Sequence, residues 1–201
     1  MKIFKRSRAE SVVYMAMLLA LGLLATSCGG PLFKVKPAVE LPPLKVDAKS
    51  ASAGGITLRV APLLSDEESQ GLFEANLPLA GVLPVRVELV YESGVPVELK
   101  EARFGLRDAE GREWKLLTAK QAISRIMKAN GITTYNPNSR KQFEKEFLAY
   151  ALDLKTPLTD SDRRRQGFLF FQTPNKEPVA SPQGFVLHVE RVPQPVEIRL
   201  N

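Results

Sequence analysis

The chain has 201 residues, of which 44% are hydrophobic and 25% are charged, and its formal net charge is +6. These values are ordinary for one globular domain with additional segments, and they exclude a low-complexity chain. The single cysteine excludes an internal disulfide, although a domain of this size buries enough apolar surface to be stable without one.

The first 27 residues have the pattern of a secretory signal peptide. A basic stretch at 2–8 is followed by an apolar run at 12–25 and then by small residues. The run is too short to cross a bilayer comfortably, which takes about 20 residues. Cleavage after residue 27 removes four basic residues and Glu10, which lowers the net charge to about +3. The positive charge is therefore weak evidence for nucleic acid, and we expect no nucleic-acid partner.

Cys28 follows these small residues directly. The motif Leu23-Leu24-Ala25-Thr26-Ser27-Cys28 resembles the lipobox of bacterial lipoproteins, with alanine where leucine is commonest. The resemblance implies that the Cys28 thiol is acylated, which anchors the chain in a membrane. Glycine after the cysteine favours the outer membrane facing the periplasm, and the outer face of the cell membrane is the alternative. The structural alternatives are a buried hydrophobic cysteine and an uncleaved anchor in which Cys28 is a bystander.

Residues 28–55 are predicted to form a flexible tether. Four prolines between 31 and 43 and the pair Gly54-Gly55 favour an extended chain that swivels at its end. Such a tether has a root-mean-square reach of about 30 Å. Apolar residues within 32–46 leave an edge strand there as the alternative.

One domain is predicted over 56–201, and its first elements are short. Alternating residues from Ile56 predict a strand that stops near Pro62. The acidic residues after Ser65 predict a capped helical turn through Phe73.

The stretch at 82–108 is predicted to be the centre of the fold. Its first half alternates apolar residues with Arg86 and Glu88, which is typical of a half-buried strand. The pattern breaks at Gly94 and resumes at 96–99. Because glycine tolerates the positive φ of a tight reversal, we expect a β-hairpin here.

Two helices are predicted in the middle of the domain, where apolar residues recur at three- and four-residue spacing. Thr118 and Gln121 form a capping box for the first helix, and Ser139 and Gln142 form one for the second. We expect a helical insertion over about 118–154.

Strand periodicity returns after the helices. Several short strands separated by prolines and glycines favour an antiparallel sandwich over a parallel sheet. The predicted fold is mainly β: an antiparallel immunoglobulin-like β-sandwich with a two-helix insertion. A turn is predicted at 108–111, and further strands at 111–117, 168–171, 185–190 and 196–200.

Three motifs carry a resemblance at the level of the domain: GVLPVRV at 81–87, LRDAEG at 106–111 and RQGFLFF at 165–171. A strand, a D-x-x-G hairpin and a late G-F-L-F-F strand resemble those of secreted bacterial lipoproteins that have an immunoglobulin-like β-sandwich and no established activity. The resemblance implies a fold and a cellular location, and it implies no catalytic residue.

The sequence offers few groups for catalysis. His188, the only histidine, is predicted to be a half-exposed strand residue, and no nucleophile, zinc or phosphate-loop motif is present. Acidic residues at 66–68, 108–110 and 160–162 lie in turns and helix starts, where backbone hydrogen bonding explains them. A glycosidase would need two such carboxylates across a cleft. We expect no cofactor and no metal.

Clustered arginines suggest contact with an anionic surface such as lipid headgroups. The alternative is a solvated basic surface balanced by Asp160 and Asp162. The candidate residues are Arg163, Arg164, Arg165, Arg140 and Lys141.

These observations predict a non-enzymatic, lipid-anchored cell-envelope protein that binds or scaffolds an envelope partner. The alternatives are an envelope polysaccharide hydrolase and a lipid- or headgroup-binding protein. A raised pKa on one carboxyl of a cleft pair would favour the hydrolase. A hollow interior, or a groove beside 163–165, would favour lipid binding.

Overall fold

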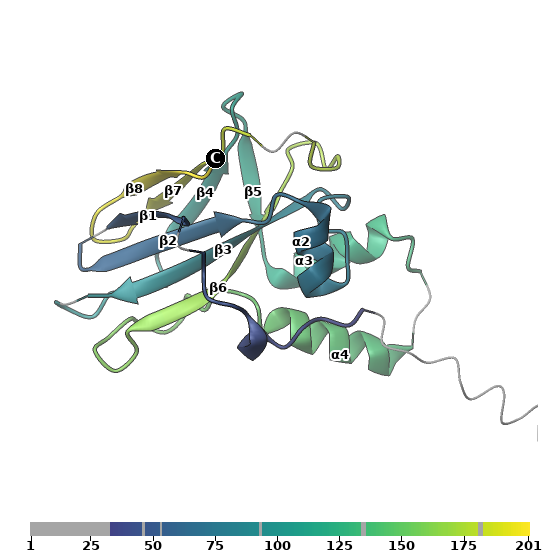
Figure 1. The fold of residues 1–201 in the computed structure, drawn as a ribbon, viewed down its shortest axis with the longest axis horizontal. Coiled ribbons are helices and arrows are strands. Elements are labelled where there is room, and N and C mark those ends of the chain that lie inside the picture. Colours follow the sequence, from purple (N-terminus) through teal and green to yellow (C-terminus); the bar gives the residue numbers. More distant parts are fainter. Residues whose placement is uncertain (1–32, 46, 53, 93, 134–135, 181–182) are drawn as a thin grey trace, which may run out of the picture.

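The computed structural model describes residues 33–45, 47–52, 54–92, 94–133, 136–180 and 183–201. The described strands are β1 (Lys49–Ser52), β2 (Ile56–Pro62), β3 (Val82–Tyr91), β4 (Arg103–Arg107), β5 (Glu113–Leu117), β6 (Arg164–Gln172), β7 (Val186–Glu190) and β8 (Val196–Arg199). They form one antiparallel sheet in the order β1-β2-β3-β6-β5-β4-β7-β8. Because the edge strands β1 and β8 contact each other, the sheet curls into a nearly closed barrel (Figure 1).

The mainly β class is confirmed, and the immunoglobulin-like sandwich is not. A sandwich consists of two stacked sheets, whereas the described strands here belong to one sheet that bends back on itself. The apolar residues of its inner face form one core, which includes Leu58, Val87, Leu106, Phe171 and Leu187.

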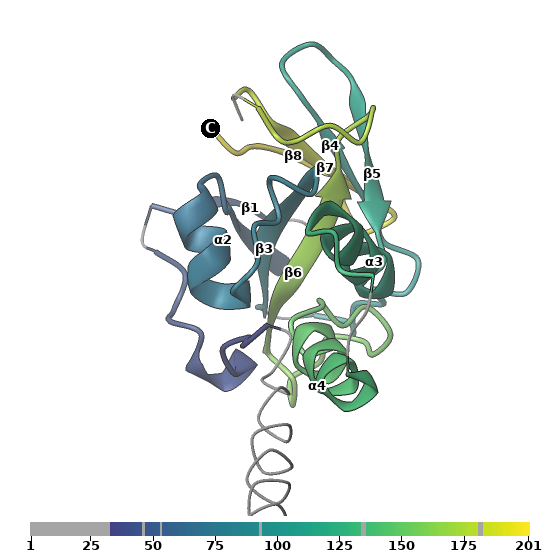
Figure 2. The ribbon, with the colours of Figure 1, turned by 90° about the vertical axis from the view of Figure 1, so that its right-hand side faces the viewer.

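Helices cover one outer face of this sheet. The described helical elements are the 3-10 turn η2 (Ala38–Glu40), α2 (Asp66–Phe73), α3 (Ala119–Ala129) and α4 (Pro137–Leu148). The three α-helices lie over β3 and β6 (Figure 2), where a second apolar core separates them from the sheet. Two helices were predicted between 118 and 154, and α3 and α4 confirm both.

Phe73 of α2 is at the centre of this second core. Its ring centroid lies 5.1 Å from those of Phe147 and Tyr150 and 5.6 Å from that of Phe168. Pairs at these separations gain about 0.5–1.5 kcal/mol beyond their buried area. The cluster therefore joins α2, the end of α4 and β6.

The hairpin predicted around Gly94 is wrong. β3 pairs with β2 on one edge and with β6 on the other, so no edge is free for residues 96–99. Within the part of the chain that the structure describes, the β-pairing of those residues is a single bridge from Val97 to Leu158. β6 takes the place of the predicted partner, and its Phe168 and Phe170 are buried in the core beneath the helices. The later turn at 108–111 does connect a hairpin, formed by β4 and β5.

Local capping signals were mostly reliable. Ser65 caps α2, and Thr118 with Gln121 forms the predicted capping box of α3. The box predicted from Ser139 is wrong, because α4 begins earlier, with Asn136 as its N-cap and Pro137 in its first turn. α4 also ends at Leu148 instead of continuing to residue 154, because residues 150–152 pair with Phe168 of β6.

The predicted tether over 28–55 is wrong in its described part. Val35 and Leu44 are buried against the domain, and β1 pairs with β2 along its whole length. The edge strand lies at 49–52 instead of within 32–46. Cys28 and the signal peptide lie outside the described residues.

Candidate functional site

A cavity of about 530 Å³ lies between the N-terminal part of the chain and the outer face of the barrel. We call residues 33–45 the N-terminal strap and this space the strap cavity. The strap passes in front of β2 and β3 beside α2 before the chain enters β1 (Figure 1). A volume of this size is typical of sites for small molecules.

The strap is attached at its two ends. Near its start, Lys36 donates its backbone N–H to the Leu72 carbonyl at 3.0 Å, and the Tyr150 hydroxyl donates to the Lys36 carbonyl at 2.6 Å. Near its end, Arg59 donates to the Lys45 carbonyl at 3.0 Å. Among the described residues, the backbone from 37 to 44 donates hydrogen bonds only within the strap. Between these attachments the strap is held by apolar packing: Leu44 is buried, and Ala38 and Leu41 pack against the second core.

The walls of the strap cavity are largely apolar, and its rim is charged. The rim has three lysines and four carboxylates, so its charges nearly cancel, and water screens those that are exposed. Glu67, one of the rim carboxylates, has a pKa lowered by a backbone hydrogen bond and by the Ser65 side chain. The apolar lining includes Leu41, Pro42, Leu63, Leu64, Leu72 and Leu200.

Arg86 is the one buried charged side chain that lines the strap cavity in the described part of the chain. It lies on the outer side of β3 and is only 6% exposed. Its Nη2 donates to the Gln166 side chain at 2.8 Å, and its Nε has no acceptor among the described residues. Burial lowers the pKa of Arg86, and the nearby Glu88 opposes that effect.

The ion pairs of Glu88 in the described residues are with two other arginines and not with Arg86. Arg59 lies 2.8 Å and Arg164 lies 2.5 Å from the two Glu88 oxygens. Glu88 itself is 1% exposed. The Arg59 and Arg164 side chains are 27% and 59% exposed, so water screens their charges, and in the described part of the chain Arg86 is the buried member of this group without a carboxylate ion pair.

The predicted anionic-surface residues do not form one surface. Arg140 pairs with Glu144 on α4, where Lys141 is also exposed, and this helix lies apart from the start of β6 (Figure 1). Arg163 pairs with Asp160 at 2.8 Å, and Arg164 pairs with Glu88. These ion pairs within the chain agree with the alternative interpretation, a solvated basic surface balanced by nearby carboxylates.

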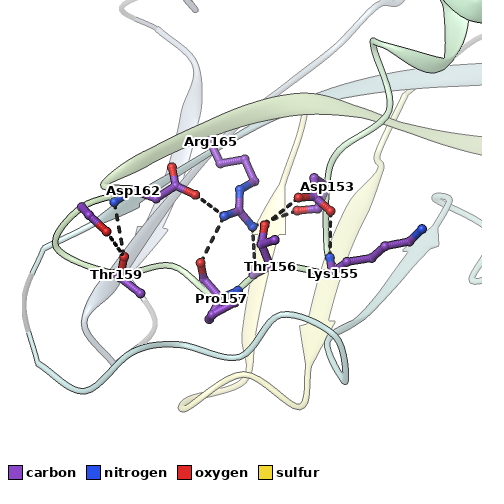
Figure 3. Close-up of polar contacts among 8 residues, drawn as sticks. Asp153, Lys155, Thr156, Pro157, Thr159, Asp162 and Arg165 are labelled. Carbon is purple, nitrogen blue, oxygen red and sulfur yellow. Dashed lines mark hydrogen bonds and ion pairs between the residues drawn. The ribbon is translucent and has the colours of Figure 1, made fainter.

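Arg165 has a structural role (Figure 3). Its guanidinium donates to the carbonyls of Asp153, Thr156 and Pro157 and to the Asp162 carboxylate. The Thr156 hydroxyl and then the Lys155 N–H lower the pKa of Asp153 in the same loop. Arg165 is 9% exposed, so it holds the 153–162 loop against β6 and is not available to an external surface.

The candidate catalytic groups also have structural partners. Asp108 accepts hydrogen bonds from Trp114 and Arg112 in the β4–β5 turn. His188 lies over Gly105 of the neighbouring strand, at 3.8 Å from Glu113 and away from the strap cavity. In the described residues, no group of three or more His, Cys, Asp or Glu side chains is placed to hold a metal ion.

Comparison with known proteins gives no family for this chain. No family model, no curated protein and no solved structure matches it. Across the described residues, no helix has the length and apolar character needed to span a membrane. The assignment of function therefore depends on the sequence motifs and on the strap cavity.

Sequence reasoning missed both Arg86 and the strap. Arg86 alternates with valines, which places it on the second face of a strand, but helices distant in sequence cover that face. The available signal for the strap was its apolar content: Phe33, Val35, Leu41 and Leu44 are unusual in a solvated tether.

Proposed function

We propose that this chain is a lipid-anchored cell-envelope protein whose domain is a non-enzymatic binding module. The basic start, the apolar run and the lipobox-like motif support acylation at Cys28, which lies outside the described residues. We also propose that the anchor lies in the outer membrane on its periplasmic side. The proposed relatives are secreted lipoproteins with immunoglobulin-like domains.

The short distance between Cys28 and the domain constrains this arrangement. Phe33 contacts Phe143 of α4 with ring centroids 5.0 Å apart. It lies five residues after Cys28, and an extended chain covers at most about 18 Å over that length. The anchored domain is therefore held next to the membrane, much closer than the 30 Å of the predicted tether.

The observation that carries the binding function is the strap cavity. An apolar space of about 530 Å³ with one buried arginine has the usual composition of a ligand site. A polysaccharide hydrolase is less well supported. It requires one carboxyl shielded from water, whereas the carboxylates that line the strap cavity, Glu40, Asp47, Glu67 and Glu68, are exposed. We therefore assign the strap cavity as the binding site.

Acylation is tested by replacing Cys28 with alanine. We expect the wild type to incorporate a labelled fatty acid and to fractionate with membranes, and Cys28→Ala to lose the label. Equal labelling of both proteins would contradict the anchor.

Occupancy of the strap cavity is tested with Gly71, a lining residue of α2 at which an added Cβ would meet open space. We expect Gly71→Leu to fill part of the cavity without a clash, and Gly71→Ala to leave it open. Small molecules are then extracted from each purified protein and compared by mass spectrometry. A molecule that accompanies the wild type and Gly71→Ala, and is reduced with Gly71→Leu, supports a binding module. Identical extracts from all three proteins would contradict it.

A further inference from the structure

We propose that the strap cavity binds a single-chain amphiphile, whose anionic oxygen head group pairs with Arg86 and whose hydrocarbon chain lies along the leucine and proline walls. This inference rests on the proposed function, because it takes the strap cavity as the binding site. It adds the chemical class of the ligand.

The volume of the cavity favours one hydrocarbon chain. A water molecule has about 30 Å³ of liquid volume, and a methylene group is of similar size. About 530 Å³ therefore holds on the order of 18 such groups. This is enough for a chain of about twelve carbons with its head group.

The lining fits such a chain chemically. Leu41 and Pro42 of the strap, Leu63 and Leu64 after β2, and Leu72 of α2 surround the space. Moving a methylene group from water into such surroundings is favourable. Leu41 of the strap also packs against the second core, so the apolar wall of the cavity continues into the domain.

Arg86 requires an anion in this position. A guanidinium has five N–H donors, and Arg86 makes one hydrogen bond, to Gln166, while its buried Nε remains unpaired among the described residues. A buried cation without a counter-charge is costly, and Glu88 is occupied by Arg59 and Arg164. A carboxylate or phosphate head supplies two oxygens in the geometry that guanidinium groups bind best.

A neutral head group would leave the buried guanidinium of Arg86 without a counter-charge. The lysines of the rim do not replace Arg86, because rim carboxylates offset them in exposed positions. The chemistry of the site therefore distinguishes an anionic amphiphile from an alcohol or a hydrocarbon with the same chain.

The test uses acylated, full-length mature protein in phosphatidylcholine vesicles and a dodecanoate with a photoreactive diazirine near the end of its chain. After illumination, we expect the label on peptides from residues 36–45 and 61–72. Unlabelled dodecanoate or dodecyl phosphate should reduce labelling at least ten-fold more effectively than dodecanol, because a charge-assisted hydrogen bond is lost with the alcohol. Whichever anion competes better identifies the head group as carboxylate or phosphate.

Variants then locate the head group. Arg86→Gln should reduce labelling about ten-fold, while Arg163→Gln, which removes an exposed arginine paired with Asp160, should leave it unchanged. Gly71→Leu should also reduce labelling. If Arg86→Gln does not fold, the comparison of dodecanoate with dodecanol on the wild type still decides the question.

Two results would overturn this inference in different ways. Equal competition by dodecanol and dodecanoate would refute the anionic head group and leave the strap cavity as a binding site. Absence of label from both lining peptides in the wild type would refute the amphiphile, and identical extracts from the Gly71 variants would refute the binding module itself.

Discussion

The hydrogen bond from Tyr150 to the strap makes stability depend on pH in a way that one substitution should remove. Tyr150 is 1% exposed, and its hydroxyl donates to the Lys36 carbonyl at 2.6 Å. Tyr150→Phe leaves the ring in the aromatic cluster but leaves that carbonyl without its donor. We expect the variant to lose about 1 kcal/mol of unfolding free energy at pH 7.

At high pH the order of stability of the wild type and Tyr150→Phe should reverse. Burial, followed by the charge of Glu40, raises the pKa of Tyr150 to about 12, from an ordinary value of about 10. Between pH 10 and 12 the unfolded chain releases the phenolic proton while the folded protein keeps it, so wild-type stability falls as the pH rises. The loss is about 1.4 kcal/mol at pH 11, and Tyr150→Phe does not undergo it.

Urea unfolding at pH 7, 9 and 11 measures both effects. Trp114, the only tryptophan, is buried against Phe185 and reports unfolding by its fluorescence. The wild type should be more stable by about 1 kcal/mol at pH 7, and Tyr150→Phe should be more stable by about 0.4 kcal/mol at pH 11. A difference that stays constant over this range would refute the buried, strap-bound hydroxyl.

Two core substitutions follow from the same packing. Phe73→Ala should cost about 3–5 kcal/mol in urea unfolding, because a fully buried ring at the centre of the helix-covered core is lost; a cost below 1 kcal/mol would contradict this role. Gly167→Ala should cost about 1–3 kcal/mol, because its new Cβ would lie 2.5 Å from the Leu152 Cα. Gly71→Ala is the matched control, because its Cβ has space in α2. We expect it to raise the free energy of unfolding by about 0.5–1 kcal/mol. Equal effects of Gly167→Ala and Gly71→Ala would refute the close approach at Gly167.

The parts of the fold that were predictable are those with local signals. The capping boxes at Ser65 and Thr118 depend on residues three positions apart, and the strand patterns depend on neighbours two positions apart. Strand pairing is not local. β3 and its partner β6 are separated by more than 70 residues, and closure of the barrel depends on contact between β1 and β8. The sequence near Gly94, where a hairpin was expected, contains no local signal for either pairing.

The candidate site was harder to predict because it combines distant segments. Arg86 is buried on the outer side of β3, where the strap and α2 line the same cavity. The prolines of the strap are equally compatible with a free tether and with a segment packed on the domain. The strap packs on the domain through apolar residues such as Val35 and Leu44. Arg165 was predicted to face an external anionic surface. It is buried instead and donates hydrogen bonds to backbone carbonyls.

The central claim is that acyl chains on Cys28 hold this domain in the cell envelope. The most direct test is the intact mass of protein purified from the membranes of its native host. We predict a polypeptide that begins at Cys28 and is heavier than residues 28–201 by the mass of the attached acyl groups. An unmodified chain that still begins at Met1 would contradict the claim.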